Sequence, residues 1–185
     1  MRTPTEIRRV GSPAELREIA RLARVIWHRH YPGIITRAQI EYMLALGYAP
    51  EVMRRELARG VVYERALVDG RLAGFAAWGP PGVGRDLELH KLYVTAEHRR
   101  HGLARRLLER ARTAAAGGGQ RAVVLAVNKR NRPALRAYRR LGFRVREPVV
   151  REIGDGFLCN DYRMELPVPP RPARESRRET SSSTR

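Results

Sequence analysis

The segment from Arg99 to Arg105 reads Arg-Arg-His-Gly-Leu-Ala-Arg and combines positive charge with small residues. It follows an apolar run, Leu87–Val94, and opens an amphipathic run at residues 102–116, which is the pattern of a strand feeding a helix. Unpaired N–H groups and the helix dipole attract anions to a helix N-terminus. Gly102 has no Cβ, so a ligand can approach the backbone there. These features predict a phosphate site.

The charge of the whole chain has a broader origin. The 185 residues carry a net charge of +18, and arginine supplies nearly all of it, since Lys91 and Lys129 are the two lysines. A basic chain can bind nucleic acid or an anionic cofactor. The arginines are spread over every predicted element, and aromatic residues are 6% of the chain, too few for a base-stacking surface. The composition therefore argues against a nucleic-acid partner.

The length suits one domain with a hydrophobic core. No apolar run reaches the roughly 20 residues of a membrane span, and the N-terminus lacks the apolar segment of a secretory signal. A single cysteine, Cys159, excludes an internal disulfide, and the five histidines lack the spacing of a metal site. We therefore expect a cytoplasmic protein with no metal and no membrane partner, and the sequence leaves a homodimer open.

Caps mark the helices of the first third of the chain. Residues 4–10 predict an edge strand, and Ser12 with Glu15 forms a capping box that begins a helix running to the Trp-His-Arg-His-Tyr segment. Thr36 and Gln39 form a second box that begins a short helix. A third helix is expected between Pro50 and Ala58, before Gly60.

The rest of the domain alternates strands with helices. Asp69-Gly70 between two apolar runs predicts a hairpin. The continuously apolar run Val123–Val127 predicts a strand buried on both faces. The fold class is therefore α/β with a mixed sheet, in a domain of residues 1–167 followed by a disordered tail at 168–185. The predicted strands are Val61–Val68, Arg71–Trp78, Leu87–Val94, Val123–Val127, Phe143–Ile153 and Leu158–Leu166, with helices at Gly102–Ala116 and from Pro133 to Leu141.

Two signatures in this order resemble the GNAT N-acetyltransferase superfamily. The segment Arg99-Arg100-His101-Gly102-Leu103-Ala104 is similar to its acetyl-CoA-binding motif, Arg/Gln-x-x-Gly-x-Gly/Ala. The segment from Asn131 through Tyr138 to Phe143 is similar to its second signature, Asn-x-x-Ala-x-x-x-Tyr-x-x-x-Gly-Phe. Further likenesses at residues 39–44, 153–157 and 161–165 resemble a bacterial branch that includes polyamine acetyltransferases. The resemblance implies the order β-α-α-β-β-β-α-β-α-β-β, with splayed central parallel strands.

The resemblance also implies where the co-substrate acetyl-CoA would bind. Its pyrophosphate would contact the backbone N–H groups from Arg100 to Ala104, and its pantetheine arm would pair with the strand end Leu92–Val94. Asn128 or Asn131 would hydrogen-bond the arm or the acetyl group. The implied cofactor-binding residues are Leu92, Tyr93, Val94, Arg99, Arg100, His101, Gly102, Leu103, Ala104, Arg105, Asn128, Asn131 and Tyr138.

The implied chemistry is direct attack of an amine on the thioester through a tetrahedral intermediate. Tyr138 is expected to protonate the leaving thiolate, because a phenol is a neutral donor at pH 7; core packing is its alternative role. Glu88 and His90 lie on one strand face by period two and are candidate general bases. Other titratable residues where the first helices would cover the acceptor site are His28, His30 and Tyr31.

Three functions stay open for the acceptor. The chain could acetylate a primary amine of a small molecule, acetylate a protein N-terminus or lysine, or act as a non-catalytic regulator that binds an acyl-CoA or nucleic acid. The branch that acetylates ribosomal-protein N-termini resembles Leu-Glu-Val-Arg-x-x-Asn, where this chain has Ala126 in place of the Glu, and this argues against a protein N-terminus as acceptor. Acidic residues in the cleft would favour a cationic amine, and the candidates are Glu41, Glu64, Asp155 and Asp161.

Overall fold

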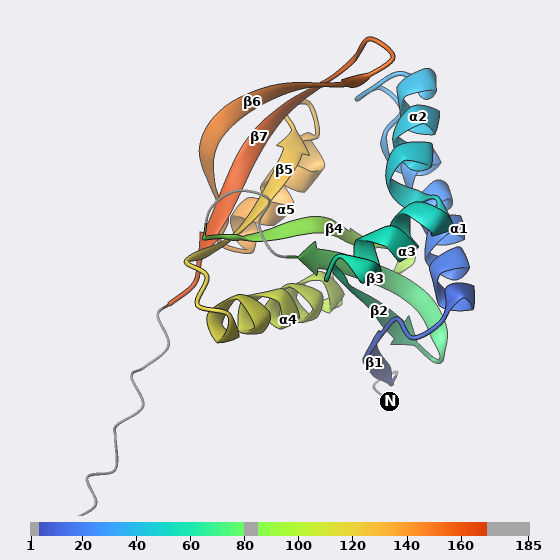
Figure 1. Cartoon of the computed structure of the whole chain (residues 1–185), viewed down its shortest axis with the longest axis vertical. Helices are drawn as coiled ribbons and strands as arrows, with labels where there is room; N and C mark the ends of the chain where they lie inside the picture. Colours follow the sequence, from blue (N-terminus) through green and yellow to red (C-terminus); the bar gives the residue numbers. More distant parts are fainter. Residues whose placement is uncertain (1–3, 80–84, 170–185) are drawn as a thin grey trace, which may run out of the picture.

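The computed structural model describes residues 4–79 and 85–169. A mixed sheet of seven strands forms its centre, in the order β1-β2-β3-β4-β5-β7-β6 (Figure 1). Strands β4 and β5 pair in parallel, and the other neighbours pair antiparallel. This architecture confirms the predicted α/β class with a mixed sheet. The strands are β1 (Thr5–Arg9), β2 (Val62–Val68), β3 (Arg71–Gly79), β4 (Leu87–Val94), β5 (Ala122–Asn128), β6 (Arg144–Gly154) and β7 (Phe157–Pro167).

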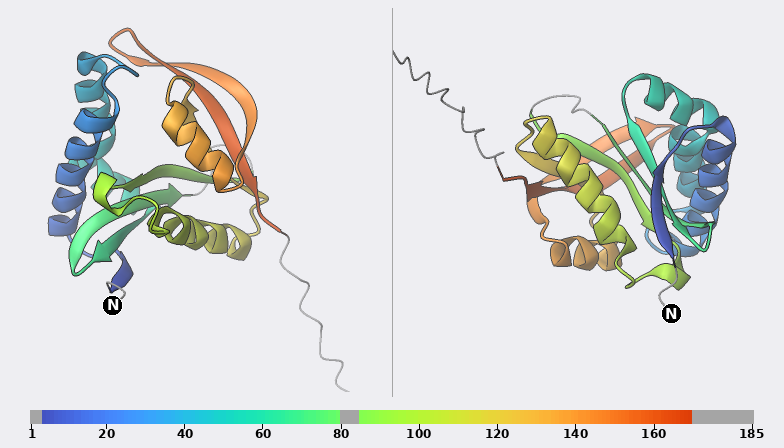
Figure 2. Two further views of the ribbon diagram at one scale, coloured as in Figure 1. Left: turned by 180° about the vertical axis from the view of Figure 1, so that it is seen from behind. Right: turned by 90° about the horizontal axis from the view of Figure 1, so that it is seen from below.

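Helices cover both faces of the sheet (Figures 1 and 2). The first three helices pack on one face, and the last two pack on the other. Within residues 4–79 and 85–169, no helix combines the length and the apolar character that a bilayer crossing requires. The helices are α1 (Pro13–His30), α2 (Arg37–Tyr48), α3 (Pro50–Ala58), α4 (Leu103–Gly117) and α5 (Arg132–Arg140), with a 3₁₀ turn, η1 (Ala96–His98), before α4.

The capping prediction is confirmed for α1 and half correct for α2. The N–H of Glu15 donates to Ser12 Oγ at 3.4 Å, and the N–H of Ser12 donates to Glu15 Oε2 at 3.0 Å. Thr36 Oγ1 likewise accepts from the N–H of Gln39 at 3.1 Å. The side chain of Gln39 does not return to the cap, because it donates to the carbonyl of Leu158 in β7 at 2.9 Å. A tertiary contact has replaced the local one.

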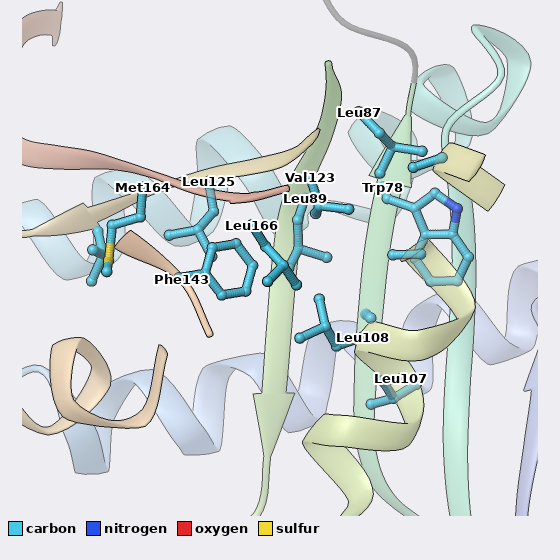
Figure 3. Packing of buried hydrophobic residues seen from close by; sticks show 14 of the residues in the cluster. Trp78, Leu87, Leu89, Leu107, Leu108, Val123, Leu125, Phe143, Met164 and Leu166 are labelled. Carbon is cyan, nitrogen blue, oxygen red and sulfur yellow. The ribbon is translucent and has the colours of Figure 1, made fainter. Parts of the chain in front are cut away.

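The larger hydrophobic core lies between the sheet and α4 (Figure 3). The predicted inward positions of α4, which include Leu107, Leu108 and Ala111, are buried at helical spacing. They pack in one cluster with Leu89 of β4 and Val123 of β5. Full burial of a leucine contributes about 1.5–3 kcal/mol to folding. This cluster therefore fixes α4, and with it the basic turn at the α4 N-terminus, against the two central strands.

Two tight turns shape the antiparallel strands. Asp69 and Gly70 have φ values of 49° and 75°, and Asp155 and Gly156 have φ values of 49° and 72°. Positive φ at both central residues is the pattern of a type I′ hairpin turn. The Asp-Gly prediction is thus confirmed between β2 and β3, and the same turn joins β6 to β7.

The predicted burial of β5 is wrong at one position. Val123, Val124, Leu125 and Val127 are buried, but Ala126 is exposed. The reason is that β4 no longer pairs with β5 at this level, so one side of the strand has lost its cover.

The end of the domain also differs from expectation. Val168 was expected in the tail, yet it is 8% exposed, and its N–H donates to the carbonyl of Arg121 at 2.8 Å. Packing therefore continues past the predicted boundary at residue 167. Residues 170–185 of the predicted tail lie outside the described residues.

Candidate functional site

A wedge opens between β4 and β5 (Figure 1). Among the described residues, pairing of the two strands is limited to Leu87 with Val123 and Glu88 with Val124. Strand β5 nevertheless continues to pair with β7 as far as Asn128. Past Glu88 the edge of β4 therefore faces no strand, and its backbone groups can pair with an extended ligand. A cleft of about 830 Å³ occupies this opening, and the predicted splay is confirmed.

A β-bulge interrupts the alternation of side chains along β4. Trp78 of β3 pairs with Leu89, and Ala77 pairs with Lys91, so His90 is left without a partner on β3. Leu89 packs in the core under α4, whereas Lys91 turns to the opposite face. Glu88 and His90 nevertheless share one face, as predicted, because Nε2 of His90 lies 3.3 Å from the position of a Cβ on Gly79, the β3 partner of Glu88. Both side chains line the cleft.

The turn before α4 exposes its backbone as predicted. Arg100 and Gly102 have φ values of 65° and 81°, in the left-handed region. Such residues turn successive N–H groups toward one side, which makes a concave site for an anion. No described side chain caps α4, and a Cβ on Gly102 would meet no atom within 4 Å. The helix N-terminus is therefore open to a phosphate.

The residues around this turn divide into two groups. The side chains of Arg99 and Ala104 line the cleft, whereas Arg100, His101 and Arg105 are exposed outside its lining. Leu103 is 3% exposed and packs in the core, so it offers a ligand only its backbone. The geometry thus suits a phosphate held by main-chain N–H groups and flanked by arginines.

Asn131 reaches the cleft at the start of α5. It caps this helix, since its Oδ1 accepts from the N–H of Ala134 at 3.2 Å. The same atom lies 3.0 Å from Nε2 of His30. Burial lowers the pKa of His30, and its Nε2–H donates to the amide oxygen of Asn131. The amide oxygen of Asn131 is thus used within the protein, by α5 and by His30, in a residue that lines the cleft.

Tyr138 lies in the wall of the cleft, and its ring packs against Phe143 in a T-shaped arrangement with centroids 5.6 Å apart. Burial raises the pKa of Tyr138 to about 12. Its phenol is therefore neutral at pH 7 and can donate a proton. The two roles weighed for this residue, packing and proton donation, are compatible in this position.

Paired charges occupy the floor of the cleft. Glu88 Oε2 accepts from Arg163 at 2.8 Å, and Glu56 Oε2 accepts from Lys91 Nζ at 2.8 Å. Partial burial lowers the pKa of His90, and the charge of Lys91 lowers it further. Lys91 is a further residue of the cleft that was not predicted from the sequence, because its burial depends on the bulge. The available signal is a lysine between apolar residues of a strand.

Aromatic side chains line the side of the cleft next to α1. The hydroxyls of Tyr31 and Tyr93 are 3.2 Å apart, and the ring of Trp27 lies 4.2 Å from that of Tyr31 between centroids. Burial raises the pKa of Tyr31 and of Tyr93, so both phenols stay neutral. Tyr31 and His30 thus reach the cleft as predicted, whereas His28 turns away to Glu41 at 3.0 Å.

The β6–β7 hairpin closes the far end of the cleft. Its tip lies beside α2 (Figure 1). Besides the bond from Gln39 to Leu158, the hydroxyl of Tyr42 donates to the carbonyl of Ile153 at 2.6 Å. The rings of Tyr42 and Phe157 add a contact with centroids 5.2 Å apart. These contacts join two segments that no local pattern connects.

The four acidic candidates lie in different places. Glu41 pairs with Arg24 at the surface of α1 and α2, and Glu64 is fully buried against Arg110. Asp155 is exposed in the β6–β7 turn. The one candidate that lines the cleft is Asp161.

Ten of the predicted site residues thus meet in one cleft. Among the described residues, His, Cys, Asp and Glu side chains form no group of three or more that could hold a metal ion. The predicted residues that line the cleft are Glu88, His90, Leu92, Tyr93, Val94, Arg99, Ala104, Asn128, Asn131 and Tyr138.

Comparison with known proteins gives matches at the levels of sequence and fold. The sequence model described as "Acetyltransferase (GNAT) family" matches residues 17–143. Uncharacterized N-acetyltransferases of Mycobacterium bovis and Mycobacterium tuberculosis are 38% identical over 96 residues, which is 52% of this chain and 60% of theirs. The chain thus spans about 60% of the length of these relatives.

Two solved structures show the likeness at the level of the fold, one over most of this chain and one over part of it. The PaiA N-acetyltransferase of Thermoplasma acidophilum, in complex with coenzyme A, superimposes with a TM-score of 0.73 at 26% identity, over 89% of this chain and 99% of that one. Nourseothricin acetyltransferase superimposes with a TM-score of 0.53 at 32% identity, over 60% of this chain and 68% of that one.

Proposed function

Because the chain belongs to the acetyltransferase (GNAT) family, we propose that it transfers an acetyl group from acetyl-CoA to a primary amine of a small molecule. The observation that carries the proposal is the separation of β4 from β5 after Glu88, beside an open helix N-terminus and with Tyr138 in the same cleft. The PaiA protein of Thermoplasma acidophilum was solved with coenzyme A, which supports the same co-substrate here.

The residues present fit coenzyme A. The free edge of β4 at Leu92–Val94 can pair with the amides of a pantetheine arm, as an added strand would. The turn at Arg100 and Gly102 can hold a pyrophosphate on its N–H groups. The backbone N–H groups are the main ligands of the pyrophosphate, and the side chain of Arg99 flanks them and adds positive charge.

Catalysis requires a proton to leave the amine nitrogen and a proton to reach the thioester sulfur. The neutral amine nitrogen attacks the thioester carbonyl carbon, and the tetrahedral intermediate collapses with loss of the thiolate. Tyr138 donates its phenolic proton to the sulfur, since its raised pKa keeps the hydroxyl protonated at neutral pH. Glu88 and His90 stay candidates for the group that accepts the proton of the amine, although Arg163 already neutralises Glu88.

The shape of the acceptor side supports a small molecule. The β6–β7 hairpin is fastened to α2 by Gln39 and Tyr42, and a bridged end leaves less room for an extended peptide than an open groove would. Ala126 faces this space with a methyl group in place of a carboxylate. Both features disfavour a protein N-terminus as acceptor.

The test is release of free thiol from acetyl-CoA against a panel of primary amines, a lysine-containing peptide and a peptide with a free N-terminus. The proposal expects turnover with at least one small amine, at a kcat/KM above that of either peptide. Higher kcat/KM with a peptide would overturn the small-molecule assignment. Tight acetyl-CoA binding without turnover on any acceptor would overturn the activity and favour a regulator.

Three expectations stay predictions. They are a cytoplasmic location, activity without a metal ion, and a homodimer as one possible assembly. Activity that survives extensive dialysis against a chelator is the expected result for the metal.

A further inference from the structure

Three carboxylates line the cleft within the described part of the chain. Glu56 and Glu88 are each neutralised by a cation at 2.8 Å, Lys91 and Arg163 respectively. Asp161 differs from both, because no described residue donates a hydrogen bond to its side chain. The cleft thus keeps one carboxylate that has no close partner of its own.

Burial makes an ionised Asp161 without a hydrogen-bond donor unfavourable in free energy. The residue is 7% exposed and sits on β7 opposite Asn128 of β5. The nearest cation is Arg151, whose guanidinium lies 3.9 Å from Asp161 Oδ2 and whose side chain is 58% exposed. A buried carboxylate without hydrogen-bond donors loses much of its hydration and receives little in return. Burial accordingly raises the pKa of Asp161, against the smaller opposing effects of Arg151 and Lys129.

Asp161 also lines the same cleft as the proposed acid, Tyr138. Its charge interacts with the phenol of Tyr31, and Tyr31 interacts in turn with Tyr93 and Tyr138. Asp161 enters the cleft from β7, whereas Tyr138 enters from α5. A ligand group held by Asp161 therefore lies in the same cleft as the hydroxyl of Tyr138.

We propose that Asp161 binds the ammonium group of the acceptor and accepts its proton. This assignment rests on the proposed function and names the residue that the function requires. It replaces Glu88, which is tied to Arg163, and it explains why a desolvated carboxylate is kept in the cleft. The missing donor of Asp161 is then the N–H of the substrate itself.

The protons balance in two steps. The ammonium gives one proton to Asp161, and the lone pair set free forms the C–N bond to the thioester carbon while the carbonyl π electrons move to oxygen. Collapse restores the C=O bond and breaks the C–S bond. Tyr138 protonates the sulfur and is restored by the second proton of the nitrogen, and Asp161 returns its proton to solvent. One proton is released per acetyl group transferred.

The first experiment is Asp161→Asn, with Asp155→Asn as the matched control, because Asp155 is an exposed aspartate of the same hairpin. For the best amine of the panel, Asp161→Asn is expected to lower kcat/KM by about 100-fold. Acetyl-CoA affinity, measured by calorimetry, should stay unchanged. Asp155→Asn should match the wild type in both measurements.

Thermal unfolding separates this role from a structural one. A raised pKa of a folded carboxyl means that folding favours its protonated form, so that its stabilisation is complete below the unfolded pKa and is lost as pH rises through the folded pKa. At pH 7 the ionised Asp161 therefore destabilises the fold. Asp161→Asn should raise Tm at pH 7 while it lowers activity, whereas loss of a structural contact would lower Tm.

A pH profile tests the wild type without any substitution. The other titratable groups that face Asp161 are Arg151 from β6, Lys129 after β5, Tyr31 from the end of α1 and Cys159 from β7. Burial raises the pKa of Tyr31 and of Cys159, so both are neutral across the acidic limb. Ethylamine and 2-fluoroethylamine differ in basicity but little in size. If Asp161 takes the proton, the acidic limb of kcat/KM has the same midpoint for both amines.

The outcomes are distinct. A wild type active on amines, with Asp161→Asn within about twofold of it, would overturn the assignment alone, since loss of a catalytic base costs far more. An acidic limb that follows the pKa of the amine would overturn it as well. A wild type that releases no thiol with any acceptor would overturn the proposed function and this assignment together.

Discussion

The side of the cleft next to α4 is built mainly from backbone, whereas the side next to β7 is built from side chains. On the α4 side, an unpaired strand edge and a helix N-terminus come from one continuous segment, residues 87–104. On the β7 side, Gln39 meets Leu158 across 119 positions, and His30 meets Asn131 across 101. The difference suggests a division of labour. Backbone geometry can hold a constant co-substrate, while side chains can vary with the acceptor.

The largest effect is expected for Tyr138→Phe, because Tyr138 lies between the α4 side and the β7 side of the cleft. The change removes one hydroxyl and keeps the ring packed on Phe143. Turnover should fall by about 100-fold, because the thiolate loses its proton donor, while coenzyme A affinity stays within about twofold. Steady-state kinetics and calorimetry check this. Unchanged turnover would leave Tyr138 with packing as its only role.

The backbone side predicts a smaller effect for Gly102→Ala. The left-handed φ of 81° costs an alanine about 1 kcal/mol of stability, and the altered turn should weaken acetyl-CoA binding by about tenfold. Gly60→Ala is the matched control, since Gly60 has a φ of 88° and open space around it, after α3. Both variants should lose similar stability in urea unfolding. Equal acetyl-CoA affinity in the two would contradict the role of the turn.

The side-chain side predicts a different signature for Tyr42→Phe. The variant loses the bond from the hydroxyl to the carbonyl of Ile153 but keeps the ring contact with Phe157. Stability should fall by about 1 kcal/mol, and KM for the amine should rise by about fivefold, with KM for acetyl-CoA unaltered. If both KM values moved together, the two sides would not be independent.

The smallest effect is expected where α1 begins, far from the cleft. Hydrogen bonds from Gly11 and Ser12 and the charge of Arg65 lower the pKa of Glu15. A lowered carboxyl pKa gives stability that is present above the unfolded pKa and is lost as pH falls through the folded pKa. Glu15→Gln should therefore reduce stability by less than about 1 kcal/mol at pH 7, and by less at pH 3. A difference in Tm that persists at pH 3 would exclude the charge as its cause.

The contrast between local backbone geometry and long-range side-chain contacts also explains how much of the fold could be predicted from the sequence. The elements, the Asp-Gly turn and the basic turn before α4 all follow from local rules, because caps, periodicity and glycine act within a few residues. The second capping box was only half formed because Gln39 found a partner in β7, and the burial of Lys91 was not predicted because the bulge depends on how β3 and β4 pair. The predicted burial of Ala126 in β5 was wrong for a similar reason, since the separation of β4 from β5 cannot be read from the sequence of β5.

The site shows the same limit. The residues near the co-substrate could be placed from two continuous signatures, and the structure brings most of them to one cleft. Four acidic residues were equal candidates for the acceptor side, and composition could not separate Asp161 from Glu64, which is buried against Arg110 instead. Their difference lies in partners supplied by other elements.

The most direct test of the two-sided cleft is a crystal structure of the protein with coenzyme A. We predict that the pyrophosphate lies on the N–H groups of Leu103 and Ala104, that the pantetheine arm pairs with Leu92–Val94, and that the sulfur lies between Tyr138 and Asp161. A pyrophosphate bound elsewhere, or a sulfur remote from Tyr138, would contradict the account.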